Sequence, residues 1–216
     1  MESAARQHDT FTAAQERILD AAEAAFSEAG FGGVGMKAIA QSAGVAQGLI
    51  HYHFDTKEGL YAAVIARRSS LINAGRQALL DAVPVDAPDR IERIFDALFR
   101  PPLGEEGGGK VYARIFAGLA VGGARDQALV QEHYDPIARR FIAALQDAAP
   151  GASKDAITWA YTFAIGMLIA SVSRDGRRER LATRHPDETE DIIRNLTIHA
   201  AAGLRGLIEK DQTTPT

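Results

Sequence analysis

Residues 36–60, MKAIAQSAGVAQGLIHYHFDTKEGL, constrain the fold more than any other part of the chain. Gly44 lies where two short helices that cross steeply need a residue able to adopt a positive φ. Ile39 supplies an apolar position before this turn, and Val45 and Ile50 supply apolar positions in and after it. The pattern predicts two helices joined by a tight turn around one small shared core.

The second helix of this pair would present one face outward. Helices in this arrangement lay that face in the major groove of DNA, where side chains reach bases and phosphates. The residues expected on the outer face are Gln47, Gly48, Leu49, His51 and Tyr52.

Helices are also predicted on both sides of this pair. Thr12 and Gln15 have the spacing of a capping box, and Gly30 ends an apolar helical face that begins at Ile18. Thr56 precedes Lys57 and Glu58 as a hydroxyl N-cap would at the start of a longer helix. Three short helices and a long exit helix are therefore expected.

Residues 12–60 resemble the DNA-binding domain of the TetR family of transcriptional repressors. The family pattern has four parts. The first helix ends in an aromatic residue and glycine, and an IA..AGV turn follows. The recognition helix then ends in HF, and a KE pair comes after it. The matching residues are Phe26, Gly30, Phe31, Ile39, Ala40, Ala43, Gly44, Val45, Gly48, His53, Phe54, Lys57 and Glu58. The resemblance implies binding to a double-stranded DNA operator.

Four positions depart from the family pattern. Ala46 stands where the family commonly has a serine that caps the recognition helix and touches phosphate, and His51 stands in place of a tyrosine. Val34 and Gly35 replace a threonine and serine that often open the preceding helix. The positions assigned to the DNA interface are Gly35, Lys37, Ala46, Gln47, Gly48, Leu49, His51, Tyr52 and Lys57.

Charge bears on how such a domain would bind DNA. Residues 1–60 carry four basic and eight acidic side chains, whereas nucleic-acid binders usually carry a basic face. Binding must then rest on a few placed groups and should depend strongly on salt. A histidine near phosphate should be driven to its charged form, so affinity should rise as pH falls if His51 contacts the backbone. An all-α protein-interaction module that has lost DNA binding remains the alternative.

The rest of the chain predicts helices separated by proline and glycine, with no alternating strand pattern, so the fold class is all-α. Helices are expected at residues 91–100, 111–121, 126–149 with a break at Pro136, 153–174 and 187–209, and a glycine-rich loop at 101–109. The expected domains are a helix-turn-helix domain at 10–60 and a helical ligand-binding and dimerisation domain at 61–210.

The last two long helices are the candidate dimer interface. Residues 156–173 are apolar nearly all round, which we attribute to burial in a bundle rather than to a membrane span. The final helix places one ridge of apolar residues at i+4 spacing: Ile192, Leu196, Ala200, Leu204 and Ile208. In the family resembled, the corresponding helices of two subunits form a four-helix bundle, which implies a homodimer suited to a near-palindromic operator.

The resemblance also implies that a small-molecule effector binds among the central helices and changes the spacing of the DNA-reading helices. The candidate pocket residues are the aromatic side chains of that region and one methionine. They are Phe95, Phe99, Tyr112, Phe116, Tyr134, Phe141, Trp159, Phe163 and Met167, of which Phe116, Trp159 and Phe163 come first. Plain core packing is the alternative for each of them.

The residue patterns offer little support for enzyme, cofactor or metal chemistry. The absence of cysteine excludes disulfides and thiolate catalysis, and the absence of a signal-like apolar run favours a cytoplasmic protein. The glycine-rich segment 104–110 lacks the serine or threonine and the preceding strand of a phosphate-binding loop. His51 and His53, two positions apart, diverge on a helix and make a poor metal pair. We expect no catalytic site, cofactor or metal.

Overall fold

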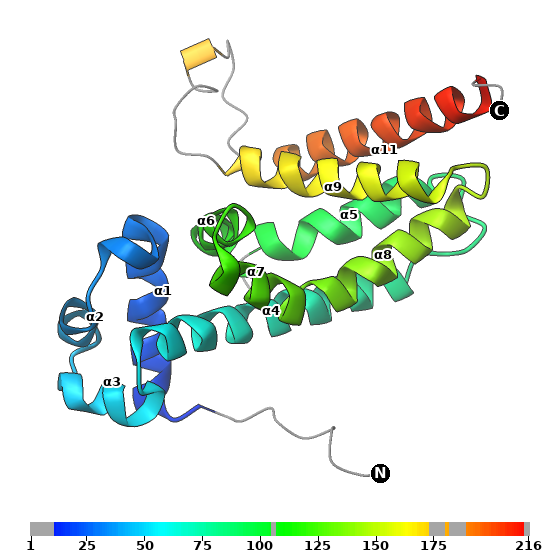
Figure 1. Ribbon diagram of the computed structural model, residues 1–216. Coiled ribbons are helices and arrows are strands. Elements are labelled where there is room, and N and C mark those ends of the chain that lie inside the picture. Colours follow the sequence, from blue (N-terminus) through cyan, green and yellow to red (C-terminus); the bar gives the residue numbers. More distant parts are fainter. Residues whose placement is uncertain (1–10, 105–106, 173–179, 182–188, 214–216) are drawn as a thin grey trace. The chain divides into compact units, whose positions relative to one another are not determined.

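The computed structural model describes residues 11–104, 107–172, 180–181 and 189–213. Every element in these ranges is an α-helix (Figure 1), as the sequence predicts. The chain divides into two compact units, Met1–Ala66 and Arg67–Thr216. The predicted helix ends at residues 174 and 187, and the predicted domain start at residue 10, lie outside the described residues.

The first unit contains α1 (Ala13–Gly33), α2 (Met36–Ala43), α3 (Gln47–Phe54) and the start of α4 (Lys57–Asp81). The predicted capping box begins α1: Thr12 Oγ1 accepts from the Gln15 N–H at 3.3 Å, and Gln15 Oε1 accepts from the Thr12 N–H at 2.8 Å. Gly30 interrupts the helical backbone with a φ of 68°, and the helix then runs on to Gly33. The capping box therefore sets the start of α1, whereas Gly30, the predicted end, is a kink and α1 ends at Gly33.

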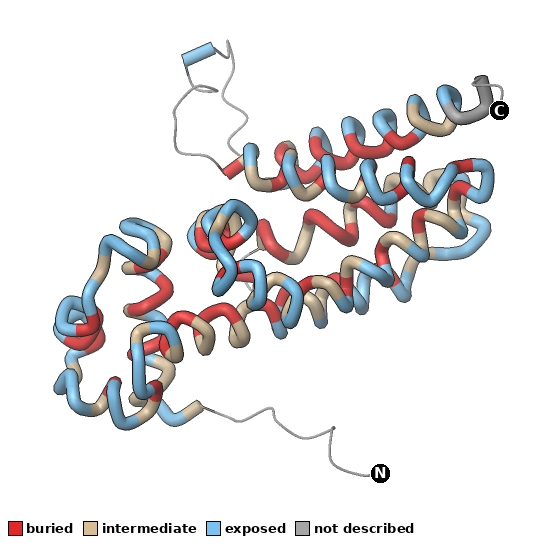
Figure 2. Tube along the Cα trace, viewed as in Figure 1, coloured by how far each residue is buried: buried red, intermediate tan, exposed pale blue. Residues whose placement is uncertain are grey.

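The core of this unit is the set of apolar side chains that the four helices turn toward one another. Figure 2 shows buried residues on each of these helices. Phe26 of α1 meets the ring of Tyr61 of α4 edge to face, with centroids 5.0 Å apart. The buried members are Ile18, Leu19, Ala22, Phe26, Ile39, Ala40, Ile50, Phe54, Leu60, Tyr61 and Val64.

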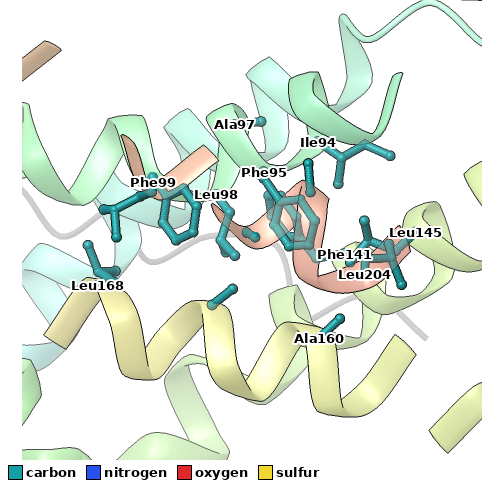
Figure 3. Close-up of a cluster of buried hydrophobic side chains, with 14 of the residues drawn as sticks. Ile94, Phe95, Ala97, Leu98, Phe99, Phe141, Leu145, Ala160, Leu168 and Leu204 are labelled. Atoms are coloured by element: carbon teal, nitrogen blue, oxygen red, sulfur yellow. The ribbon is translucent and has the colours of Figure 1, made fainter. Parts of the chain in front are cut away.

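The second unit contains the rest of α4 and, among its described residues, six further helices. They are α5 (Arg90–Leu103), α6 (Gly109–Ala120), α7 (Ala124–His133), α8 (Asp135–Ala148), α9 (Lys154–Ser171) and α11 (Thr189–Thr213). The helix α5 packs against α8 and α11, and α9 packs against the same two helices. Figure 3 shows Phe95, Leu98 and Phe99 of α5 among side chains of α8, α9 and α11, so α5 lies at the centre of this core.

The predicted loop at residues 101–109 is wrong at its start, because α5 continues through Pro101 and Pro102 to Leu103. Prolines lack the N–H that bonds four residues back, so the carbonyl groups of Ala97 and Leu98 lose their helical donors. The Arg76 Nε of α4 donates to the Leu98 oxygen at 3.0 Å and replaces one of them. Contacts with another helix thus accompany a helix that continues through two prolines, which end most helices.

Proline has the predicted effect at the other position. The segment 126–149 is split into α7 and α8, and Pro136 lies in the first turn of α8. The first turn tolerates proline because its N–H groups have no partner within the helix.

The predicted apolar ridge of α11 packs within the chain itself. Ile192, Leu196, Ala200 and Leu204 are buried in the core cluster, and Ile208 packs partly buried against it. The opposite face of α11 exposes Ile198, and α9 exposes Trp159 and Phe163. Among the described residues, the structure contains no helix with the length and apolar character needed to cross a membrane.

Candidate nucleic-acid interface and ligand cavity

The turn between α2 and α3 depends on Gly44. Its backbone is left-handed, with φ 65° and ψ 37°, and its N–H points to the carbonyl oxygens of Ala40 and Gln41. The Val45 N–H also donates to the Ala40 oxygen, at 3.0 Å. These bonds close the end of α2, as the sequence predicts, and let the chain turn into α3.

One face of α3 is buried and the other is open. Ile50 and Phe54 are buried in the first unit, whereas Gln47, Gly48 and His51 are exposed. The side chain of Tyr52 is 82% exposed although it is a large aromatic residue. Of the other candidate DNA contacts, Gly35, Lys37 and Ala46 are exposed, and Leu49 and Lys57 are half-buried. The Tyr52 ring meets the neighbouring His53 ring edge to face, with centroids 5.0 Å apart, and most of its surface stays open.

Hydrogen bonds orient His51 on this open face. Its Nδ1 lies 2.8 Å from the Asp55 carbonyl oxygen, and its Nε2 lies 3.3 Å from Gln47 Nε2. Because a carbonyl oxygen only accepts, Nδ1 carries the hydrogen, and in the neutral ring Nε2 accepts from the Gln47 amide. These two contacts hold the imidazole ring on the open face of α3.

The N-terminus of α3 has no side-chain cap. Ala46 adopts the extended N-cap conformation, with φ −68° and ψ 140°, but has no oxygen to bond the first-turn N–H groups. Helix N-termini attract phosphate through such N–H groups and through the helix dipole. The alanine therefore leaves the end of α3 open to an external acceptor.

A tight turn links α3 to α4. Asp55 has a φ of 61° and a ψ of −68°, and the Thr56 N–H donates across it to the Phe54 oxygen at 2.7 Å. This is the geometry of a γ-turn, which is strained for a residue with a side chain. Thr56 Oγ1 then accepts from the Gly59 N–H at 3.0 Å, which confirms the predicted N-cap of α4.

Lys57, the first residue of α4, is held over an aromatic ring. Its Nζ lies 4.4 Å from the centroid of Phe31, within the range of a cation–π contact. The contact holds the ammonium group close to the surface of the first unit. Lys57 can approach a phosphate without ordering a fully extended side chain.

The second unit contains a cavity with about 310 Å³ of empty space, including its opening to solvent. Residues of α4, α5, α6 and α9, with Tyr134 between α7 and α8, form its walls. They are Ile72, Arg76, Pro102, Tyr112, Ala113, Phe116, Tyr134, Leu168 and Ile169. The walls stand close together, so the free centre admits little more than a water molecule.

Three of the predicted pocket residues, Tyr112, Phe116 and Tyr134, lie in these walls. Phe95, Phe99 and Phe141 are fully buried in the core cluster instead, and Met167 packs partly buried against it. Trp159 and Phe163 lie on the surface, 55% and 56% exposed, with their rings stacked 5.2 Å apart. The pocket therefore forms around α6 and not around the aromatic pair of α9.

Arg76 and Ile72 are cavity residues that sequence reasoning missed. In the sequence, Arg76 is one of several charged residues on a long predicted helix, and its neighbours in the sequence do not mark it as a cavity residue. The structure buries Arg76 beside Tyr112 and Tyr134, whose hydroxyl groups hydrogen-bond each other. Burial lowers the pKa of the Arg76 guanidinium, and the phenol groups of Tyr161, Tyr134 and Tyr112 partly offset this effect.

Family models match both parts of the chain. A model described as "Bacterial regulatory proteins, tetR family" matches residues 18–64. A second, described as "Tetracyclin repressor-like, C-terminal domain", matches residues 92–203, more than half of the chain. The first match contains the helix-turn-helix, and the second contains the cavity residues that follow α4.

Individual relatives match over part of the chain. The HTH-type transcriptional regulator BetI of Pseudomonas fluorescens is 33% identical over 88 residues, covering 38% of this chain and 45% of that protein. The HTH-type transcriptional regulator UidR of Escherichia coli K12 is 47% identical over 49 residues, covering 23% of this chain and 25% of that protein. The chain thus spans less than half the length of these curated relatives.

Solved structures match over nearly the whole chain. The fatty acid degradation regulator FadR from Bacillus halodurans superposes with a TM-score of 0.69 at 15% identity, covering 91% of this chain and 99% of that one. The TetR family regulator PfmR from Thermus thermophilus gives a TM-score of 0.64 at 17% identity, covering 87% of this chain and 98% of that one. At such identities the similarity establishes the fold.

Proposed function

Because this chain belongs to the TetR family of DNA-binding transcriptional regulators, we propose that it is a ligand-responsive repressor that binds a near-palindromic operator as a homodimer. The observation that carries the proposal is the open face of α3. It presents Gln47, His51 and Tyr52 while Ile50 and Phe54 anchor the helix in its core. A recognition helix needs this division between anchoring and reading residues.

We assign the contacts to DNA by their placement around this face. The side chains of Gln47, Gly48, Leu49, His51 and Tyr52 meet base edges and the nearby backbone. The open N-terminus of α3 at Ala46, together with Gly35, Lys37 and Lys57, meets phosphates. With four basic against eight acidic residues in positions 1–60, these few contacts make the affinity strongly dependent on salt.

The outer faces of α9 and α11 form the proposed homodimer interface. Trp159 and Phe163 on α9, and Ile198 on α11, are large apolar side chains that are each more than half exposed. Gly203 and Gly206 on α11 have no atom within 4 Å of where a Cβ would stand, so a second helix can approach closely there. Two copies joined in this way read two half-sites about 34–36 Å apart on one face of the DNA.

The cavity of the second unit is the proposed effector site. Ile72 and Arg76 of its wall lie on α4, the same continuous helix that begins at Lys57. A ligand that fits the cavity better in one arrangement of α4 than in another shifts the population toward that arrangement. Because the resting cavity is narrow, a ligand has to displace its walls, which gives it differential affinity for the two states.

A selection of the purified full chain against fragmented DNA of its own genome, at low salt, tests the proposal. We expect a shared near-palindrome among the retained fragments, and loss of that enrichment when Gln47 and Tyr52 are both replaced by alanine. Val85→Ala, an exposed position in the second unit, serves as the matched control.

The absence of enrichment, both alone and with small-molecule extract added as a source of corepressor, would contradict operator binding. That result would favour the protein-interaction module instead. Enrichment that survives the double replacement on α3 would contradict the assigned reading face.

A further inference from the structure

Arg76 is the largest fully buried side chain among the described residues, with only 1% of it exposed. It lies on α4 and forms part of the cavity wall with Tyr112 and Tyr134. A guanidinium group stays protonated in proteins, so this position holds a positive charge away from water. Such a charge needs compensation from its surroundings.

Part of the guanidinium has a structural role. The Nε group donates to the Leu98 carbonyl oxygen at 3.0 Å, the oxygen that Pro102 cannot serve. That bond accounts for one of the five N–H groups of an arginine side chain. The two terminal amino groups carry the other four.

The described residues around Arg76 do not supply an anion. Among the described residues, no carboxylate forms an ion pair with it, and the groups that act on it electrostatically are the phenols of Tyr161, Tyr134 and Tyr112. Phenol groups are neutral at neutral pH. The buried charge therefore lies beside hydroxyl groups and the cavity, and the part of the chain that the structure describes provides no counter-ion for it.

The remaining wall defines what else the ligand must carry. Ile72, Phe116 and Leu168 are apolar and offer no hydrogen bonds from their side chains. A ligand that fills this space needs an apolar body joined to one anionic group. The narrow centre favours a single compact anion over a multiply charged one.

We propose that the cavity binds a monocarboxylate with an apolar body, whose carboxylate accepts hydrogen bonds from the terminal amino groups of Arg76 and whose body packs against Phe116 and Leu168. The planar fork of arginine matches the two oxygens of a carboxylate. This inference rests on the proposed function, since it names the chemical class of the effector of that site.

The proposal also accounts for how binding reaches the rest of α4. The bound carboxylate would pull on a side chain of α4 while the apolar body displaces Phe116 of α6. Ligand binding then changes the packing between α4 and α6 directly, because the anion and the body act on different helices.

Binding of matched acids and amides to the purified full chain tests the charge requirement. The probes are hexanoate, octanoate and 4-phenylbutyrate, each compared with its primary amide by calorimetric titration and by thermal unfolding. We expect at least one acid to raise the unfolding temperature with dose and to bind at least about tenfold more tightly than its amide. Equal binding of acid and amide, or no binding of any acid, would overturn the proposal.

Substitutions identify the residue responsible. Arg76→Gln should remove the preference for the acid, while Arg93→Gln, an exposed arginine on α5, should leave it unchanged. If Arg76→Gln fails to fold because Leu98 loses its donor, Arg76→Lys keeps a charge and a donor. Arg76→Lys should weaken acid binding and leave amide binding unchanged, because an ammonium cannot form the paired bonds. An acid preference that is equally strong in these variants would contradict the role of Arg76.

The same acids are then added to the complex with an operator fragment recovered from the genomic selection. If no acid binds the protein and no acid changes the operator complex, this inference is refuted while the proposed DNA binding stands. Acid binding through Arg76 in a protein that retains no DNA would refute the proposed function and leave the carboxylate site standing.

Discussion

A Cβ atom on Gly59 would stand 2.3 Å from the carbonyl oxygen of Phe54. No real Cβ approaches a backbone oxygen so closely, so glycine at position 59 is required by the way α3 joins α4. The same junction forces Asp55 into a positive φ and closes a γ-turn between Phe54 and Thr56. Backbone contacts thus constrain the end of α3, in addition to the burial of the Phe54 side chain.

Gly59→Ala should destabilise the first unit by roughly 1–3 kcal/mol, because the added methyl group overpacks against backbone that cannot move without opening the turn. Urea unfolding followed by circular dichroism measures the change. Gly118→Ala is the matched control, since Gly118 is helical and has open space around its Cβ position. The control should be neutral or stabilising by up to about 1 kcal/mol. Equal effects of the two substitutions would contradict the steric argument.

Ala46→Ser should stabilise the chain by about 1 kcal/mol, because a hydroxyl oxygen at the N-cap of α3 can accept from a first-turn N–H group. It should also tighten operator binding, because the same hydroxyl can donate its hydrogen to a phosphate. Thermal unfolding and a DNA titration measure the two effects. The reverse substitution elsewhere, Ser153→Ala, removes the hydroxyl that accepts from the Ala156 N–H at the start of α9. It should cost a similar free energy of unfolding and leave operator affinity unchanged. A tighter complex without added stability would mean that the serine only contacts phosphate.

His51→Ala should weaken operator affinity by roughly three- to tenfold, as expected for one lost hydrogen bond. The substitution removes the ring that the Asp55 carbonyl oxygen and the Gln47 amide orient on the open face of α3. Fluorescence anisotropy with a labelled operator at constant ionic strength measures the affinity, and a value equal to that of the wild type would exclude His51 as a contact.

How far the sequence predicts this structure depends on whether a feature is set locally. The caps at Thr12 and Thr56 and the left-handed Gly44 are encoded by residues next to them, and each is found where the sequence predicts it. The extension of α5 through Pro102 is accompanied by a hydrogen bond from Arg76, which lies on another helix. No local pattern carries that information.

The cavity residues also depend on long-range packing that the local sequence does not encode. Aromatic residues at helical spacing are equally suited to a core and to a cavity, and the structure separates Phe95, in the core, from Phe116, in the cavity wall. Trp159 and Phe163 are apolar enough for either role but lie on a surface. The helices packed around α9 determine which of its apolar faces is buried. The residue pattern of α9 alone does not predict this face.

Trp159→Glu should convert the proposed dimer to a monomer, with a dissociation constant raised by on the order of 100-fold or more, because a charge would be placed in the centre of an apolar interface. The stacked pair of Trp159 and Phe163 together with Ile198 is the largest exposed apolar feature of α9 and α11. Sedimentation velocity over a concentration series measures the association. Because only a dimer binds both operator half-sites at once, the affinity for the full operator should fall as the fraction of dimer falls.

Val85→Glu is the matched control for this substitution. Val85 is an exposed aliphatic residue outside α9 and α11, so the added charge should leave both the association state and the operator affinity unchanged. Since a surface glutamate alters the free energy of unfolding little, circular dichroism should show both variants folded. A folded Trp159→Glu variant that sediments as a dimer would exclude these outer faces as the interface, and the dimer would then have to form through another surface.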